Sequence, residues 1–234
     1  SPHQHHARAL ARLDACAAVV LATPTASGKT LVYNLPVLRA IAAGEPGHAL
    51  YVFPLKALER DQRDRLEADV RALGLPTEGV VEIYDGDTPT AKRKKIREAP
   101  PRVLVTTPDM LHMGILPMHA AWKHFFASLR WIVVDELHTY RGVFGAHVSQ
   151  VLRRLLRIAA HHGARPQLVG ASATIPNPAE MARRLSGRPC EVIEADGAPR
   201  PRRHVVLMNP AGSPHTAAAK LFRASLELGL RTIA

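Results

Sequence analysis

The chain has 234 residues, of which 47% are hydrophobic but only 5% are aromatic, and its formal net charge is +11. This length allows one large domain, or one domain and part of another, with an aliphatic core. No apolar run approaches the roughly 20 residues of a membrane-spanning helix, which argues against such a helix. The positive charge favours a polyanionic partner such as nucleic acid, although an arginine-rich coding bias is the alternative.

Short apolar runs alternate along the chain with segments whose apolar residues recur at helical spacing. Strands are predicted at residues 18–22, 49–53, 80–84, 103–106, 131–135, 167–171, 191–193 and 205–208. Helices are predicted at residues 29–43, 55–73, 90–98, 144–161 and 178–185. Several strands are almost continuously apolar, as in a parallel sheet whose two faces are both buried. The sequence therefore predicts an α/β domain with a mostly parallel sheet and helices on both faces.

The C-terminal segment has a different pattern. Residues 196–203 are rich in arginine and proline, which indicates a linker or a surface loop. Residues 214–230 have helical spacing, and residues 231–234 are typical of the start of another strand. We therefore predict that residues 1–212 form a first domain and that residues 213–234 begin a second, truncated one.

The string ATPTASGKT, residues 22–30, separates a predicted strand from a predicted helix. In this setting SGKT is the informative half of a phosphate-binding loop, whose backbone N–H groups surround the phosphates at a helix N-terminus. We expect Lys29 to reach the β- and γ-phosphates of ATP, Thr30 to hold Mg²⁺ through its hydroxyl, and Gly28 to let the backbone approach closely. The rest of the predicted nucleotide-binding loop consists of Thr25, Ala26 and Ser27. Thr23 and Ala26 stand where many such loops have glycine, which is tolerable because main-chain donors form the cradle.

The string WIVVDELH, residues 131–138, leads from four apolar residues into two carboxylates. The carboxyl ends of the strands are where α/β sheets bind ligands. We expect Asp135 to bind Mg²⁺ through water and Glu136 to orient or deprotonate the attacking water, because phosphoryl transfer needs mainly positioning and charge neutralisation. The alternative is that both are solvated turn residues. The predicted cofactors are ATP and Mg²⁺, and the predicted catalytic residues are Lys29, Asp135 and Glu136.

Together, ATPTASGKT, DELH and the string SAT at residues 172–174 resemble motifs I, II and III of superfamily 2 helicases of the DEAD/DEAH type. FPLKAL at residues 53–58 and TTPDMLH at residues 106–112 resemble motifs Ia and Ib, and DGDT at residues 85–88 resembles the turn between them. Gln4 resembles the upstream glutamine that reads adenine. The longer string DELHTYRGVFGAHV, residues 135–148, is most similar to the mitomycin-repair helicases, bacterial relatives of the RecQ-like DNA repair helicases.

The resemblance implies a RecA-like P-loop NTPase fold, in which ATP binds between two lobes and this chain carries the first lobe and the opening of the second. It implies contacts to the nucleic-acid backbone, which position the strand without reading its sequence, from Pro54, Lys56, Gly86, Asp87, Thr107, Pro108 and Asp109. His138, Ser172 and Thr174 would couple hydrolysis to DNA, with the motif III hydroxyls bonding to the DELH segment. The second lobe's arginine finger is absent, so the chain alone is expected to be nearly inert.

The function that the resemblance favours is an ATP-driven DNA helicase or translocase in DNA repair. Its expected partners are single-stranded or partly duplex DNA and the second lobe, and its expected location is the bacterial cytoplasm, at the nucleoid when bound to DNA. An RNA helicase or remodeller is the alternative, since backbone contacts discriminate weakly between the two nucleic acids. A nucleotide-binding module without catalysis is a third hypothesis.

Three further features leave alternatives open. The basic run at residues 91–97 is either a solvated helix face or a phosphate-contacting patch. Tyr140, Arg141 and Phe144 follow the acidic strand and contact nucleic acid, contact the second lobe or pack internally. The pair His161 and His162 has no acidic or cysteine neighbours at metal-ligand spacing, and neither have the histidines at residues 3, 5 and 6, so the sequence does not predict a metal site there.

Overall fold

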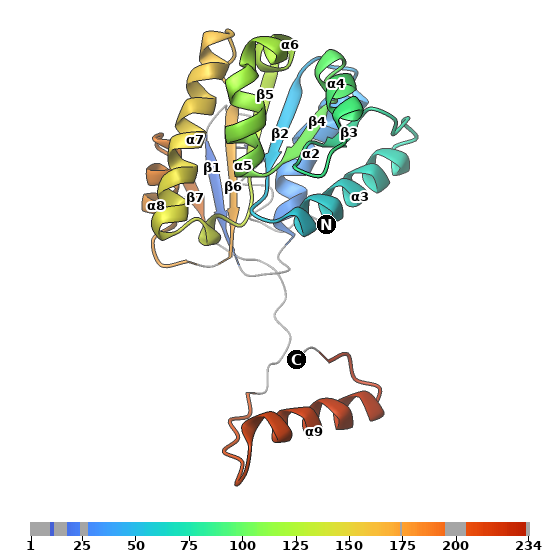
Figure 1. Cartoon of the computed structure of the whole chain (residues 1–234), viewed down its shortest axis with the longest axis vertical. Helices are drawn as coiled ribbons and strands as arrows, with labels where there is room; N and C mark the ends of the chain where they lie inside the picture. The colour runs from blue at the N-terminus through green and yellow to red at the C-terminus, as the bar shows by residue number, and fades with distance from the viewer. Residues whose placement is uncertain (1–9, 12–17, 24–27, 174, 195–204, 233–234) are drawn as a thin grey trace. The chain divides into compact units, whose positions relative to one another are not determined.

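The computed structural model describes residues 10–11, 18–23, 28–173, 175–194 and 205–232. Its centre is a seven-stranded sheet with the strand order β3-β4-β2-β5-β6-β1-β7 (Figure 1). All the paired strands run parallel. The strands are β1 (Val19–Ala22), β2 (His48–Val52), β3 (Val81–Ile83), β4 (Val103–Thr106), β5 (Leu129–Val134), β6 (Gln167–Ser172) and β7 (Glu191–Ile193). The predicted α/β class with a mostly parallel sheet is confirmed.

Both faces of the sheet are buried, which explains the nearly continuous apolar runs. In β2, Ala49 and Tyr51 join one apolar cluster, while Leu50 and Val52 join the other. Successive side chains of a strand point to opposite faces, so a strand covered on both sides needs apolar residues at every position. All four of these side chains are 0% exposed.

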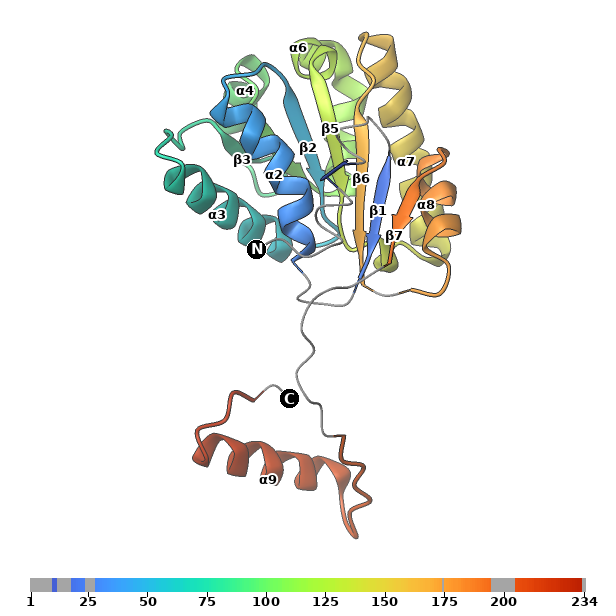
Figure 2. The same ribbon diagram turned by 180° about the vertical axis from the view of Figure 1, so that it is seen from behind.

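Helices cover the two faces of the sheet unequally. On one face lie α2 (Lys29–Ala42) and α3 (Lys56–Ala72), in front of the strands in Figure 2. The other face carries α4 (Thr90–Glu98), α7 (Gly142–His161), α8 (Pro178–Ser186) and four short consecutive segments. These segments are α5 (Pro108–Met110), the π-helix η1 (Leu111–Ile115), the 3₁₀ segment η2 (Leu116–Trp122) and α6 (Lys123–Ala127).

The sequence predicts no helix or strand at residues 108–127. Gly114 and Pro117 interrupt the helical periodicity there, so no single long helix forms. The segment is held instead by large buried side chains, because Trp122, Phe125 and Phe126 are each 0% exposed. Tertiary packing rather than local propensity therefore fixes this part of the chain.

Contacts between Cα atoms divide the chain into two compact units, residues 1–198 and 199–234. In the second unit, α9 (Pro214–Glu227) begins after Ser213, whose hydroxyl accepts a hydrogen bond from the Thr216 N–H at 3.5 Å. The strand predicted at residues 205–208 is wrong, because these residues form no strand and their side chains are exposed. The assignment of residues 213–234 to a second lobe stays a prediction. No described helix combines the length and the apolar character needed to cross a membrane.

The strand order gathers the sequence motifs into two groups at one edge of the sheet. The strands β5, β6 and β1 are neighbours, and their carboxyl ends lead into the DELH segment, motif III and the phosphate-binding loop. The strands β3, β4 and β2 are also neighbours, and they lead into the DGDT turn, motif Ib and motif Ia. Carboxyl ends of parallel strands meet at the same edge, so the two groups adjoin where β2 pairs with β5.

Candidate nucleotide and nucleic-acid sites

The described part of the phosphate-binding loop begins helix α2. Gly28 is the residue before the helix and has a φ of 76°, a left-handed conformation that glycine adopts without steric cost. Lys29 Nζ donates a hydrogen bond of 2.8 Å to the Thr23 carbonyl oxygen, so the lysine side chain reaches back across the loop. This places a cation and the helix N-terminus together, which is the arrangement that binds phosphates.

A cavity of about 760 Å³ brings the two acidic residues to this helix. It is lined by Gly28, Lys29 and Thr30 from the loop, by Asp135 and Glu136, and by residues of α2, α3 and the end of β2. The predicted nucleotide and catalytic residues that the structure describes therefore share one cavity. Gln4, Thr25, Ala26 and Ser27 lie outside the described residues.

Tyr33 connects the loop to the acidic segment. Its hydroxyl donates a hydrogen bond of 2.7 Å to Asp135 Oδ2, and it lies 3.4 Å from Thr30 Oγ1. Tyr33 is 1% exposed and packs edge-on against Tyr51 with ring centroids 5.5 Å apart. The buried ring thus holds the two predicted Mg²⁺ ligands, Thr30 and Asp135, on the same side of the cavity.

Burial raises the pKa of Asp135, and the neighbouring Glu136 charge raises it further. The hydrogen bonds from Tyr33 and from the Glu136 N–H, together with the Lys29 charge, act in the opposite direction. A carboxylate whose charge is only partly compensated favours a nearby cation. Thr30 and Asp135 supply the oxygen ligands that Mg²⁺ prefers, so the residues present fit this ion.

Glu136 has an unusual backbone conformation. Its φ of 51° is the only positive value among the described residues that are not glycine. Its N–H donates a hydrogen bond of 2.7 Å to Asp135 Oδ1, which turns the chain sharply after β5. Such strain is found mostly at functional sites.

His138 links the acidic segment to motif III. Its Nδ1 lies 3.3 Å from Glu136 Oε2 and 3.4 Å from the backbone nitrogen of Ala173. A single ring nitrogen cannot donate to the carboxylate and accept from the N–H at the same time. The Ser172 hydroxyl, expected to bond to the DELH segment, is buried without a hydrogen-bond partner among the described residues, and Thr174 lies outside them.

The predicted nucleic-acid residues follow β2, β3 and β4, in turns and at the starts of α3 and α5. Lys56, at the start of α3, forms an ion pair of 2.8 Å with Asp87 of the DGDT turn. Gly86 lies beside them, since an added Cβ there would be 3.5 Å from Lys56 Nζ. Two of the seven predicted contacts are therefore paired with each other.

The turn that carries Asp87 is built from its own side chains and from α4. Asp85 Oδ1 accepts hydrogen bonds from the Asp87 N–H and the Thr88 hydroxyl. Arg93 of α4 donates to the carbonyl oxygens of Asp85 and Gly86 at 2.8 and 3.1 Å. The basic run at residues 91–97 is thus not only a solvated face, because one of its arginines supports this turn.

Motif Ib begins helix α5. The Thr107 side chain accepts a hydrogen bond of 3.3 Å from the Met110 N–H and so caps the helix. Pro108 is buried at the start of the helix, whereas Asp109 is exposed. Pro54 is half-buried after β2.

A family model described as the DEAD/DEAH box helicase matches residues 1–182, which is more than half of the chain. The chain belongs to the DEAD/DEAH box helicase family. The resemblance seen in the motifs is therefore confirmed at the level of the family.

Two curated helicases are similar over most of this chain. The uncharacterized ATP-dependent helicase YprA of Bacillus subtilis is 50% identical over 192 residues, and the ATP-dependent helicase HRQ1 of Saccharomyces cerevisiae is 37% identical over 211 residues. These matches cover 82% and 89% of this chain. They cover only 25% and 20% of the two relatives, so the chain spans a quarter or less of their length.

Solved helicase structures share the fold. The DUF1998 helicase MrfA bound to DNA and AMPPNP has 44% identity and a TM-score of 0.87, over 96% of this chain and 32% of that one. The Mycobacterium smegmatis helicase Lhr bound to single-stranded DNA and AMP-PNP has 32% identity and a TM-score of 0.70, over 85% of this chain and 26% of that one. The predicted RecA-like fold is confirmed by these matches.

Several residues of this cavity and its surroundings could not be assigned from the sequence alone. Tyr33 is 102 positions from Asp135, so the sequence gives no sign of their contact. The sequence shows only that Tyr33 lies one helical turn after Thr30. Asn34 and Gln62 line the cavity and are joined by a hydrogen bond of 3.1 Å. Tyr140, left open between contact and packing, is buried at 3% exposure against Phe144, with ring centroids 5.6 Å apart.

Proposed function

We propose that this chain is the first motor lobe of an ATP-driven DNA helicase or translocase that acts in DNA repair. The carrying observation is that one cavity is lined by Gly28, Lys29, Thr30, Asp135 and Glu136. Adjoining strands lead into the turns predicted to hold the nucleic-acid backbone. The relatives named as ATP-dependent helicases, and the MrfA structure with DNA and AMPPNP, support the assignment.

Binding of ATP would change the hydrogen-bond partner of Lys29. Lys29 now donates to the Thr23 carbonyl oxygen, and we infer that phosphate oxygens replace this acceptor when ATP binds. Thr30 and Asp135 would hold Mg²⁺, which supplies positive charge at the transferred phosphoryl group. Tyr33 keeps the Asp135 carboxylate oriented toward the cavity.

Glu136 would act on the attacking water. Its strained backbone lies directly after the residue that would bind Mg²⁺, so its carboxylate borders the cavity. General-base catalysis of this kind contributes about 10²–10⁴ in rate. The second lobe is proposed to complete the site, since an arginine finger contributes roughly 10³–10⁵ more.

Coupling between hydrolysis and DNA would pass through His138. When its Nδ1 is unprotonated it accepts from the Ala173 N–H, and when it is protonated it donates to the Glu136 carboxylate. A change of partner therefore connects the catalytic carboxylate with motif III, which follows β6. Because His138 has these two alternative partners, its contact is a route by which the presence of ATP or of its hydrolysis products would affect the rest of the lobe.

On the DNA side, the pair Lys56 and Asp87 would open when a phosphate arrives. Both side chains are exposed, and the Lys56 ammonium holds the pKa of Asp87 below its usual range. A DNA phosphate competes for the same ammonium group, and such contacts position a strand without reading its sequence. We infer that Asp87 occupies the Lys56 ammonium group as long as no DNA phosphate is bound.

The test uses a longer protein that includes the second lobe and compares ATP hydrolysis with no nucleic acid, single-stranded DNA and single-stranded RNA. DNA-stimulated turnover above that with RNA is expected. Glu136→Gln is expected to keep ATP binding and lower turnover about 10²–10⁴-fold. Glu180→Gln, a carboxylate on α8 paired with Arg184, is the matched control.

The alternatives give different results in this assay. Equal or stronger stimulation by RNA would favour an RNA remodeller. Absence of turnover in the two-lobe protein, with ATP binding intact, would favour a nucleotide-binding module without catalysis. Turnover that survives in Glu136→Gln would remove that residue from the mechanism.

A further inference from the structure

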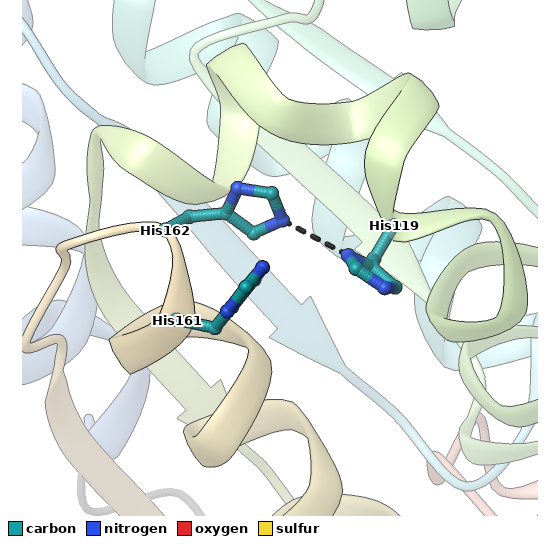
Figure 3. A group of neighbouring side chains, drawn as sticks. All are labelled: His119, His161 and His162. Atoms are coloured by element: carbon teal, nitrogen blue, oxygen red, sulfur yellow. Dashed lines mark hydrogen bonds between the residues drawn. The ribbon is translucent and has the colours of Figure 1, made fainter.

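Three histidines from two segments meet at the edge of the sheet opposite the nucleotide cavity. His161 and His162 lie at the end of α7, and His119 lies in η2 (Figure 3). One ring nitrogen from each lies within 4.8 Å of the other two. His119 Nδ1 and His162 Nε2 are 3.0 Å apart. These three residues form the histidine cluster. His119 lies 42 positions before His161, so spacing in the sequence does not reveal the cluster.

The nitrogen positions suit a small divalent ion. Zn²⁺ binds imidazole nitrogen at 2.0–2.1 Å, and two nitrogens on a tetrahedral ion lie roughly 3.3 Å apart. The separation of 3.0 Å between His119 Nδ1 and His162 Nε2 is close to this value. In Figure 3 the imidazole of His161 extends from the end of α7 toward the other two rings. Three imidazoles and one open position form a coordination set that Zn²⁺ accepts.

The surroundings favour a cation at this place. Helix α7 has 20 residues, and its C-terminal end, where His161 lies, carries the negative end of the helix dipole. The His162 ring stacks on Phe126 with an angle of 11° between the planes, which limits its rotation.

We propose that the histidine cluster is a binding site for a borderline transition-metal ion, with Zn²⁺ as the foremost candidate. It is distinct from the predicted Mg²⁺ site, because the cluster precedes the amino end of β6 and Asp135 follows the carboxyl end of β5. Across a six-residue strand this separation is on the order of 20 Å. The ion would tie η2 to the end of α7 and thereby stabilise the segment that follows motif Ib.

The experiment is a calorimetric titration of Zn²⁺ into the whole chain, with thermal unfolding followed with and without the metal. Because His3, His5 and His6 can also bind metal, the titration is made in a background in which these three are alanine. We expect one Zn²⁺ per chain in that background and a rise in Tm that EDTA reverses.

Two ligand variants and one control make the result specific. His161 is exposed and its only ring contacts among the described residues are with the other two histidines, so His161→Ala leaves the core intact. We expect it to weaken Zn²⁺ binding roughly tenfold or more, since loss of even an outer-shell partner costs that much. His119→Gln is the second ligand variant. His147→Ala, an exposed histidine near the other end of α7, should leave binding unchanged.

Three results would overturn the site. The first is the absence of Zn²⁺ binding in the background without the N-terminal histidines. The second is equal affinity for Zn²⁺ in that background and in both ligand variants. The third is a loss of Zn²⁺ affinity in His147→Ala as large as that in the ligand variants. Circular dichroism of each variant shows whether it is folded, so a loss of binding in a folded His161→Ala chain supports the site.

Discussion

Glu59 is a buried carboxyl whose removal should make the protein more stable. It lies in the first turn of α3 at 0% exposure, and neither carboxyl oxygen has a hydrogen-bond partner among the described residues. Burial raises the pKa of Glu59 to about 7, with the Asp85 charge adding to the effect and Lys56 and Arg60 opposing it. The Glu59→Gln variant removes the charge and keeps nearly the same shape.

The sign of the pH dependence follows from the raised pKa. Below pH 4.5, the usual pKa of the group, both the folded and the unfolded chain hold the proton, and no penalty exists. Between pH 4.5 and about 7 only the unfolded chain releases it, so the free energy of unfolding falls as the pH rises. Above that range the folded chain is ionised too, and the penalty reaches its full size. Each pH unit between the two pKa values lowers the free energy of unfolding by about 1.4 kcal/mol, so the full loss is about 3 kcal/mol.

Urea unfolding between pH 4 and pH 8 measures this difference. The two tryptophans, Trp122 and Trp131, are both buried and report unfolding by fluorescence. The variant should match the parent chain near pH 4 and exceed it by up to about 3 kcal/mol at pH 8. Glu180→Gln, on the exposed face of α8, should show no such trend. A difference that is independent of pH, or a variant that is less stable at pH 8, would refute the reasoning.

Three further changes test other contacts. Tyr33→Phe removes the hydroxyl bonded to Asp135 and should lower the free energy of unfolding at pH 7 by about 1–2 kcal/mol, measured with urea. Gly170→Ala would put a Cβ 2.6 Å from Leu137 Cδ1. It should lower the free energy of unfolding by about 1–3 kcal/mol, measured with urea, and slow ATP hydrolysis by the protein that includes the second lobe, because the DELH segment is displaced. Lys56→Ala should weaken binding of single-stranded DNA similarly for all sequences and reduce the salt slope by about 1, measured by fluorescence anisotropy.

Most of the sheet could be predicted because its strands are buried on both faces. Runs such as residues 103–106 are apolar or β-branched throughout, and few other structures require that. The apolar run at residues 205–208 has the same appearance but forms no strand, because a strand also needs a partner and the described sheet ends at β7. Local pattern alone cannot supply that information.

The candidate site was predictable where its residues are adjacent in sequence. The strings SGKT and DELH each carry their chemistry within four positions. Contacts between distant segments were not predictable, since nothing in the sequence pairs Tyr33 with Asp135 or His119 with His162. The order of the strands decides these contacts, and it follows from packing over the whole sheet rather than from any one motif.

The assignment of the phosphate-binding loop is tested by calorimetric titration of Mg·ADP and Mg·ATP into this chain and its Lys29→Ala variant. We expect one nucleotide site in the parent chain, loss of binding in Lys29→Ala and unchanged binding in Lys123→Ala, an exposed lysine on α6. Unchanged affinity in Lys29→Ala would mean that the loop before α2 is not the phosphate site.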